Sequence, residues 1–304
     1  FFKLKNKKKN ISSFFQFSLL FIQPIFMTSN IAIARGALGN IPPISLAFSR
    51  WLLVFLIIFP FIYQSIFKKK KYFKEEFWKL TFLASTGYVG CGALPYISGL
   101  TTTVTNMSII YALSPIFIVL LSAYIYKERL KIFQYSGVIL SLLGVSFIIF
   151  KGNFNNFVNL NFTTGDLWIF GAAISWSLFS IFLINWKSKF SIIERFTLMS
   201  FIGSIILAPL FIVEHLYFLP TKFDTIYLEF SLVAALFPGI IAFLMYTKLQ
   251  QVVGASIAGL TVYLMPIYGS IYGMVLFSEN LVHFHFYGAL MVLLGIFLAK
   301  KKYK

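Results

Sequence analysis

The acidic residues come first, because paired carboxylates serve as general acids and bases and a buried carboxylate carries protons in many transporters. The nine are Glu75, Glu76, Glu128, Asp166, Glu194, Glu214, Asp224, Glu229 and Glu279. None lies at the middle of an apolar segment. The three histidines lie near segment ends, and His283 and His285, two residues apart, point in different directions on a helix. We therefore expect no enzymatic dyad, no metal site, no cofactor and no side-chain proton relay.

Arg50 is the one basic residue well inside an apolar segment, because Arg195 and Lys248 lie within four residues of segment ends. An arginine at the centre of a span costs about 2.5–3.5 kcal/mol on insertion scales, so its side chain should face a cavity or a partner. One interpretation is an anion or carboxylate contact through the forked guanidinium. The other, which we favour, is an anchor to helix-end carbonyl groups, because Glu194 and Arg195 occupy the corresponding place in the second half of the chain.

Polar and aromatic residues inside the apolar segments are the candidates for substrate binding. Amides and hydroxyls in a membrane cost free energy without partners, so they usually face inward. Many of them only hold helices together, yet a cavity rich in Tyr and Trp with few charges suits a neutral, zwitterionic or aromatic molecule of amino-acid size. The candidates are Asn30, Tyr88, Asn106, Tyr111, Trp176, Tyr246 and Tyr263.

Two prolines and two glutamates recur at matched places in the two halves of the chain. Pro115 and Pro266 lie inside apolar segments, where each removes a backbone hydrogen bond and kinks the helix. They are candidate gates, or else static packing kinks. Glu128 and Glu279 each precede an apolar segment, where a carboxylate caps free N–H groups and complements the helix dipole. We expect both glutamates to be structural caps.

The composition requires a membrane. Of 304 residues, 59% are hydrophobic and 12% are charged, and the mean hydropathy is +0.85. Such a chain is neither a soluble enzyme nor a nucleic-acid-binding protein, although its net charge is +17. The single cysteine, Cys91, excludes a disulfide within the chain.

Ten segments are long and apolar enough to cross the bilayer, which needs about 20 residues of helix. The first could be misread as a cleaved signal peptide, but its apolar stretch is long for one. The loops between segments are too short for a nucleotide-binding domain, so direct use of ATP is excluded. The segments are 13–34, 44–67, 80–99, 105–126, 132–150, 166–186, 192–213, 231–250, 255–277 and 283–299.

The basic residues give the orientation. With both ends of the chain in the cytoplasm, 22 of the 26 Lys and Arg residues fall on the cytoplasmic side of a ten-span protein. The cytoplasmic ends are the basic tails 1–12 and 300–304. A missing or additional span would scramble this asymmetry.

The chain also repeats itself with an offset of 151 residues. The offset superimposes Pro115 on Pro266, Gly137 on Gly288 and Gly144 on Gly295, with Glu128 on Glu279 between them. Each half, 13–151 and 152–299, holds five segments, and because five is odd the second half enters the membrane inverted. Inverted repeats are the architecture of alternating-access transporters, with the substrate held between the halves.

These motifs resemble the EamA family of the drug/metabolite transporter superfamily over nearly the whole chain. The resemblance is carried by Ser29 to Ile33, Ala47 to Arg50, Leu113 to Gly144, Ile174 to Leu178, and Gly254 to Glu279. It implies ten helices and a cavity lined chiefly by segments 13–34, 80–99, 105–126, 166–186, 231–250 and 255–277. One departure is Pro95 within Leu-Pro-Tyr at 94–96, where the family more usually has an apolar residue.

The expected function is therefore secondary transport of a small metabolite across the inner membrane by alternating access. Export is the direction that the resemblance implies, and the sequence specifies neither the substrate, the coupling ion nor the oligomeric state. The expected partners are the small-molecule substrate and the lipid bilayer, without nucleic acid. A channel or a membrane-embedded enzyme is the alternative, although neither a charged filter nor a catalytic constellation is visible in the sequence.

Overall fold

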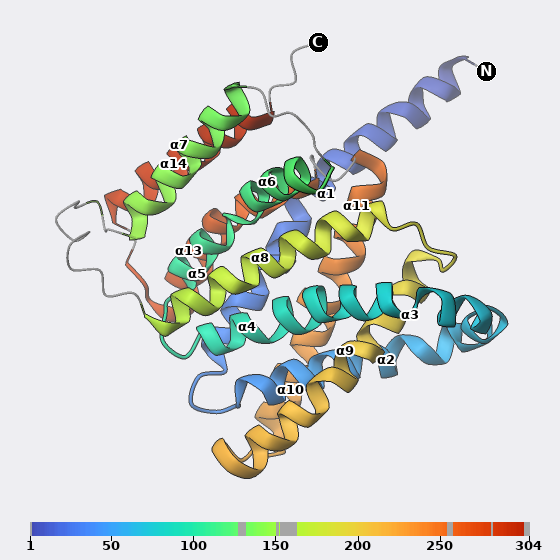
Figure 1. The fold of residues 1–304 in the computed structure, drawn as a ribbon. Coiled ribbons are helices and arrows are strands. Elements are labelled where there is room, and N and C mark those ends of the chain that lie inside the picture. Colours follow the sequence, from blue (N-terminus) through green and yellow to red (C-terminus); the bar gives the residue numbers. More distant parts are fainter. Residues whose placement is uncertain are drawn as a thin grey trace.

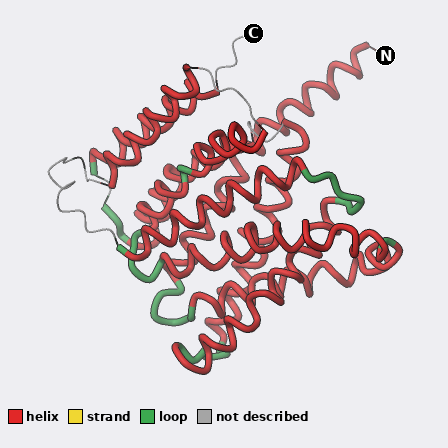
Figure 2. The backbone as a smooth tube through the Cα atoms, in the orientation of Figure 1, coloured by secondary structure: helices red, strands yellow, loops and turns green. Residues whose placement is uncertain are grey.

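A computed structural model describes residues 2–126, 132–149, 152, 163–253, 258–280 and 282–300. All regular structure in this part of the chain is helical, and Figure 2 shows no strand within it. The all-α class expected from composition is confirmed.

The apolar segments of the sequence are mostly helical where the structure describes them. The first half contains α1 (Phe2–Gly36), α2 (Pro43–Lys68), α3 (Lys70–Ala84), the π-helical η1 (Ser85–Gly90), α4 (Cys91–Ser98), α5 (Val104–Tyr111), α6 (Ser114–Tyr126) and α7 (Ile132–Ile149). The second half contains α8 (Thr164–Asn185), α9 (Ile192–Val213), the π-helical η3 (Glu214–Phe218), α10 (Thr225–Ala234), the π-helical η4 (Ala235–Ile241), α11 (Ala242–Val253), the 3₁₀-helical η5 (Gly259–Leu264), α13 (Met265–Phe277) and α14 (His283–Lys300).

Five continuous helical stretches in the described residues are long and apolar enough to cross a bilayer. The remaining apolar segments are shorter or broken: the segment 80–99, for example, passes from α3 through η1 into α4, which contains Pro95. The five long stretches are Ser18–Gly36, Pro43–Lys68, Thr164–Asn185, Ile192–Phe218 and Thr225–Gln251.

The breaks in the helices occur at matched places in the two halves. The offset of 151 residues places η1 within η4, so each half contains a π-helical stretch at the same point. Pro115 is the second residue of α6 and Pro266 the second residue of α13. Because proline has no N–H, it fits the first turn of a helix without losing a bond. Each proline therefore begins a new helical segment after a turn or a 3₁₀ stretch, and does not bend a continuous helix as the sequence suggested.

At the basic end of the bundle, carboxylates join α2 and α3 to α9 and the loop before it. The basic end is the end of the bundle where the α2–α3 junction meets the α8–α9 loop. There Glu194 accepts hydrogen bonds from Ser65 and, at 2.6 Å, from Nζ of Lys69. Glu76 accepts from the backbone N–H of Lys189 at 2.8 Å.

At the opposite end, carboxylates cap helices across the two halves. Glu214 accepts from the backbone N–H groups of Ile44 and Ser45 at the start of α2, at 3.0 and 2.7 Å. Glu279 does the same for Val104 and Thr105 at the start of α5, at 3.0 and 3.2 Å. Each carboxylate satisfies N–H groups that a helix N-terminus leaves free.

Helices α7 and α14 form a pair at one edge of the molecule (Figure 1). The glycines that match in the repeat, Gly137 and Gly144 in α7 and Gly288 and Gly295 in α14, are all buried. Small residues of this kind let two helices approach closely. The other helices surround a centre in which Trp51, Trp176 and Tyr88 have no exposed surface.

Candidate functional site

Arg50 lies at the centre of the helix bundle with 1% of its surface exposed. Its Nη1 donates to Oδ1 of Asn30 in α1 at 2.6 Å and to the hydroxyl of Tyr96 in α4 at 3.4 Å. Its Nη2 donates to the carbonyl oxygen of Pro238 at 2.9 Å. That carbonyl belongs to the π-helical η4, so the guanidinium binds a break inside a helix and not a helix end.

The Arg50 guanidinium has no carboxylate partner within salt-bridge distance among the described residues. Its carbon lies 4.2 Å from the centre of the Trp51 ring, a cation–π contact worth up to about 2 kcal/mol in a desolvated place. Its Nε makes no hydrogen bond. A buried charge of this kind makes the centre of the bundle a candidate functional site.

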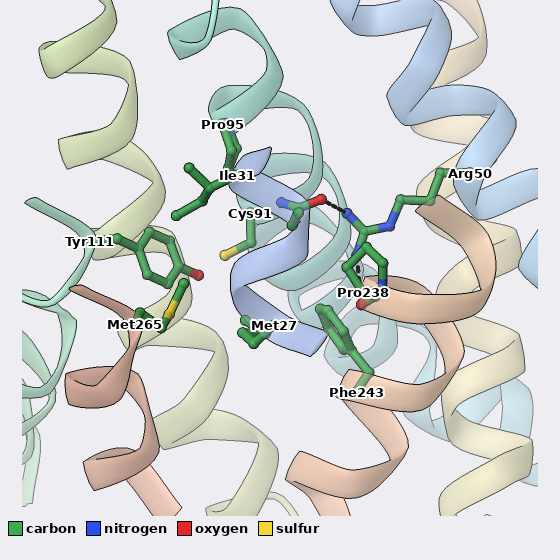
Figure 3. A pocket seen from close by; sticks show the side chains of 10 residues that line it. Met27, Ile31, Arg50, Cys91, Pro95, Tyr111, Pro238, Phe243 and Met265 are labelled. Atoms are coloured by element: carbon green, nitrogen blue, oxygen red, sulfur yellow. Dashed lines mark hydrogen bonds between the residues drawn. The ribbon is translucent and has the colours of Figure 1, made fainter. Parts of the chain in front are cut away.

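A small cavity adjoins this guanidinium. Its volume is about 10 Å³, room for about one water molecule, so the centre is closed. Figure 3 shows Arg50 and Tyr111 on opposite sides of it, with the Cys91 thiol between them. Ten residues line it: Met27, Asn30, Ile31, Arg50, Cys91, Pro95, Tyr111, Pro238, Phe243 and Met265.

The structure brings Asn30, Tyr111 and Arg50 together at this cavity and leaves the other candidates outside its lining. Trp176 and Tyr246 are buried behind the wall, where their rings lie 4.7 Å apart between centroids. Tyr88 packs against Trp51 with a centroid distance of 4.3 Å. Tyr263 is buried in η5 without lining the cavity, and Asn106 belongs to the first turn of α5, where its N–H is capped by Thr103.

Sequence reasoning missed most of the apolar lining. Cys91 was considered only for disulfide and metal chemistry, yet its thiol faces the cavity. Pro95 is the signal that could have led there, because it lies inside α4 next to Tyr96, which binds Arg50. The segment 44–67 contributes Arg50 to the lining, whereas the described lining contains no residue of α8, the segment 166–186.

An aromatic cluster fills the space beside the cavity. Trp51, Tyr88, Phe196 and Phe243 pack together with centroid distances between 4.3 and 6.5 Å, and the indole N–H of Trp51 donates to the carbonyl of Tyr88 at 2.6 Å. The close packing depends on Gly92, where a Cβ would collide with the Trp51 indole. All four rings are buried.

A second and larger pocket lies at the basic end, between the end of α8, the start of α9 and α11. Its volume is about 350 Å³, within the range of small-molecule sites. We call it the basic-end pocket. Its lining is Leu183, Ile184, Trp186, Lys187, Ser188, Phe190, Ile192, Arg195, Phe196, Met199, Thr247, Gln250 and Gln251.

The sequence predicts that Glu279 and Glu128 cap helices, and the structure describes only the first of them. Glu279 is bound at a helix N-terminus, but that helix is α5 of the first half and not α14, which follows Glu279 in the chain. The reason is geometric: residues 278–280 lie beside α5, and Oε2 of Glu279 also accepts from the Thr105 hydroxyl at 2.6 Å. Glu128 lies outside the described residues.

Around the central cavity the described residues offer hydrogen-bond donors, acceptors and apolar surface. Among the described residues, no three His, Cys, Asp or Glu side chains lie together as metal ligands do. The titratable groups at the cavity are Arg50, Cys91 and Tyr111, and the cavity lining contains no carboxylate.

Comparison with known proteins places this chain in a family. The model of the EamA-like transporter family matches residues 15–150 and again 163–300, one match in each half. "Uncharacterized transporter YyaM" of Bacillus subtilis (strain 168) is 24% identical over 280 residues, covering 90% of both chains. An "Uncharacterized transporter" of Archaeoglobus fulgidus is 24% identical over 289 residues, covering 93% of this chain and 96% of the relative.

Two further comparisons agree with these. An "Uncharacterized transporter" of Methanothermobacter thermautotrophicus is 25% identical over 207 residues, which cover 67% of this chain and 59% of the relative's length. A crystal structure aligns with a TM-score of 0.63 at 17% identity, covering 93% of this chain and 96% of that one, which shows a shared fold. With the family model matched across both halves, the chain belongs to the EamA-like transporter family and is a membrane transporter.

Proposed function

We propose that this transporter is a secondary carrier for a small zwitterionic metabolite. The metabolite has the size of an amino acid and bears a carboxylate. The single observation that carries the proposal is the Arg50 guanidinium, buried at the closed central cavity without a carboxylate partner in the described part of the chain. A substrate carboxylate supplies the missing counter-ion. The apolar and aromatic lining, including Tyr111 and Phe243, accommodates the rest of the molecule.

The bonds of Arg50 also explain why the guanidinium is suited to a ligand. Asn30 and Pro238 hold the two Nη atoms in place with oxygen acceptors, so the fork is oriented before substrate arrives. Nε stays free to donate. The carbonyl anchor and the carboxylate contact, two separate hypotheses from the sequence, are therefore compatible roles of one side chain.

Alternating access between the two halves is the mechanism we propose. The matched π-helical stretches η1 and η4, and the matched segment starts at Pro115 and Pro266, support two inverted repeats of five helices that rearrange around a shared centre. The central cavity of about 10 Å³ is too small for a metabolite, so transport requires these helices to separate.

We propose further that both ends of the chain are cytoplasmic, with ten spans in the inner membrane, and that the carrier exports its substrate. The basic residues support the orientation: Lys69, Lys187 and Lys189 meet at one end of the bundle. Carboxylate-based proton coupling is not part of the proposal, because Asp166, Glu194, Glu214 and Glu279 all accept backbone N–H groups at helix ends.

A ligand panel tests the substrate class. The purified protein in phosphatidylcholine nanodiscs is heated with phenylalanine, phenylacetate, phenethylamine or phenylacetamide, which share a ring and differ in charge. We expect the two carboxylate-bearing compounds to raise the melting temperature and the amine and amide to have no effect. A ligand at 100 times its Kd stabilises by about 2.7 kcal/mol.

Variants of Arg50 then assign the effect to the central cavity. Arg50→Gln should remove most of the stabilisation, and Arg50→Lys, which keeps the charge but loses the fork, should retain more of it. Circular dichroism and gel filtration establish that each variant is folded. Stabilisation by the amine or amide alone, or a stabilisation by phenylacetate in folded Arg50→Gln equal to that of the unaltered protein, contradicts the proposal.

Counterflow in proteoliposomes distinguishes a carrier from a channel. Preloaded substrate should accelerate uptake of labelled substrate through a carrier and saturate with concentration. Ionic current across a planar bilayer without saturation would indicate a channel.

A further inference from the structure

The basic-end pocket contains two buried donors that the central site does not use. Gln250 in α11 is 3% exposed, and its Nε2 makes no hydrogen bond. Arg195 in α9 donates from Nη1 to the carbonyl of Leu183 at 3.0 Å, whereas its Nε makes no hydrogen bond. Both residues line the same pocket of about 350 Å³. A buried donor without an acceptor is destabilising unless something else binds it.

The charges around this pocket favour an anion. Lys187 and Arg195 both line it. The nearby carboxylates are already bound: Glu76 accepts from Ser188 and Lys189, and Glu194 accepts from Lys69. Glu76 lies within electrostatic reach of Arg195 and offsets part of its charge. The two unpartnered donors therefore belong to side chains that line a pocket whose own lining contains no acidic side chain.

The other walls of the pocket are apolar. Trp186, Phe190 and Phe196 supply ring faces, and Leu183, Ile184, Ile192 and Met199 supply aliphatic surface. A pocket with apolar walls and a few convergent polar groups binds a molecule that has an apolar body and one polar end.

We propose that the basic-end pocket is a second binding site, which takes the carboxylate or phosphate group of a molecule with an apolar body. Arg195 and Gln250 bind the anionic group through their free donors, and the rings of Trp186 and Phe196 contact the body. The molecule is either a soluble organic acid or an anionic lipid, because both present the same chemistry to these residues. The site does not depend on Arg50.

Trp186 allows the site to be observed directly. Because its indole lines the pocket, a ligand that binds there changes its fluorescence. The experiment titrates phenylacetate or phenylacetamide into Arg50→Gln protein in phosphatidylcholine nanodiscs and subtracts the signal of the same protein carrying Trp186→Phe. The Arg50→Gln background removes the central site, so failure here and failure of the proposed function are separate results.

We expect a saturable signal with phenylacetate and none with phenylacetamide. Arg195→Gln and Gln250→Leu should each raise the Kd by about tenfold, the effect of losing a hydrogen bond to a charged group. Two matched controls lie outside the pocket: Arg35→Gln, whose Nη1 also binds one backbone carbonyl, and Gln64→Leu, an exposed glutamine. Both should leave the Kd unchanged.

The membrane composition identifies the source of the anion. An equal Kd in nanodiscs with and without phosphatidylglycerol supports a soluble acid, and a higher apparent Kd with phosphatidylglycerol supports a lipid headgroup in the same site. Equal binding of phenylacetamide, an unchanged Kd in both Arg195→Gln and Gln250→Leu, or a full signal after Trp186→Phe overturns the proposal.

Discussion

The central cavity and the basic-end pocket each have one arginine in their lining, and the surroundings of the two arginines differ. Arg50 has 1% of its surface exposed, binds three oxygen atoms and faces a cavity of about 10 Å³. Arg195 is half-buried, has one bond to a backbone carbonyl, and faces a pocket of about 350 Å³. The first arginine is fixed in position and the second retains freedom to adapt.

This difference suits the two cavities to different tasks, namely distinguishing between substrates in the central cavity and accepting varied anions in the basic-end pocket. A guanidinium held by Asn30 and Pro238 presents one geometry, which suits a closed site that distinguishes substrates. A guanidinium with a single anchor in an open pocket can accept anions of several shapes. Helix α11 connects the two, because Phe243 lines the central cavity and Thr247 and Gln250 line the basic-end pocket on the same helix face, about 10 Å apart along the axis.

The largest expected effect is on transport, and it tests whether Arg50 contributes more to counterflow than Arg195 does. Arg50→Gln should lower counterflow by at least about 30-fold, because losing one member of a buried, hydrogen-bonded charge contact costs about 2–5 kcal/mol. Arg195→Gln should lower it by about tenfold or less, because its pocket stays open to water. Equal losses in the two variants, measured in the same proteoliposomes, would show that the comparison is wrong.

The fold was largely predictable because membrane helices are specified by long runs of apolar residues. The segments at α1, α2, α8 and α9 followed from such runs, and the breaks before α6 and α13 were signalled by Pro115 and Pro266. The π-helical η1 and η4 were not predicted. Both stretches contain glycine and η4 also contains Pro238, but these residue types occur throughout the chain and do not by themselves specify a π-helical turn.

The site was predictable only in part. Asn30, Tyr111 and Arg50 were identified because polar groups in apolar segments must find partners. Trp176 and Tyr88 look equivalent to Tyr111 in the sequence, yet they pack away from the cavity, which depends on helix rotation. The basic-end pocket was missed because Arg195 and Gln250 are distant in sequence and lie near segment ends, where polar residues are ordinary.

Adding volume to each cavity measures how tightly each is closed. Cys91→Leu at the central cavity should destabilise the protein by about 1–3 kcal/mol, because extra methyl groups in a packed core force strain. Thr247→Leu in the basic-end pocket should have a smaller effect, because that pocket has room and the Thr247 hydroxyl only bonds the Phe243 carbonyl in its own helix. The measurement is thermal unfolding in nanodiscs. The reverse order of the two effects would contradict the volumes.

The matched prolines test how the central cavity opens. Pro115→Ala and Pro266→Ala allow a continuous helix to extend through the segment starts, so we expect the turnover rate to fall by about tenfold, or about 1.4 kcal/mol in activation free energy. The Kd for phenylacetate should stay the same, because neither proline contacts Arg50. Single-turnover and equilibrium measurements separate the two quantities. Unchanged turnover in both variants would make the prolines static packing elements.

The smallest expected effect concerns Tyr246, which lies between the two cavities on α11. Its hydroxyl lies 3.1 Å from that of Ser180, and both residues are buried. Tyr246→Phe removes this bond and should lower stability by about 1 kcal/mol, with a fewfold reduction in counterflow and no change in the Kd of either cavity. Tyr268→Phe is the matched control, because its hydroxyl also makes one hydrogen bond, to the carbonyl of Phe21, but is solvent-exposed. If Tyr246→Phe changed the Kd of one cavity and not the other, Tyr246 would be part of that binding site, and the expectation of an unchanged Kd would be wrong.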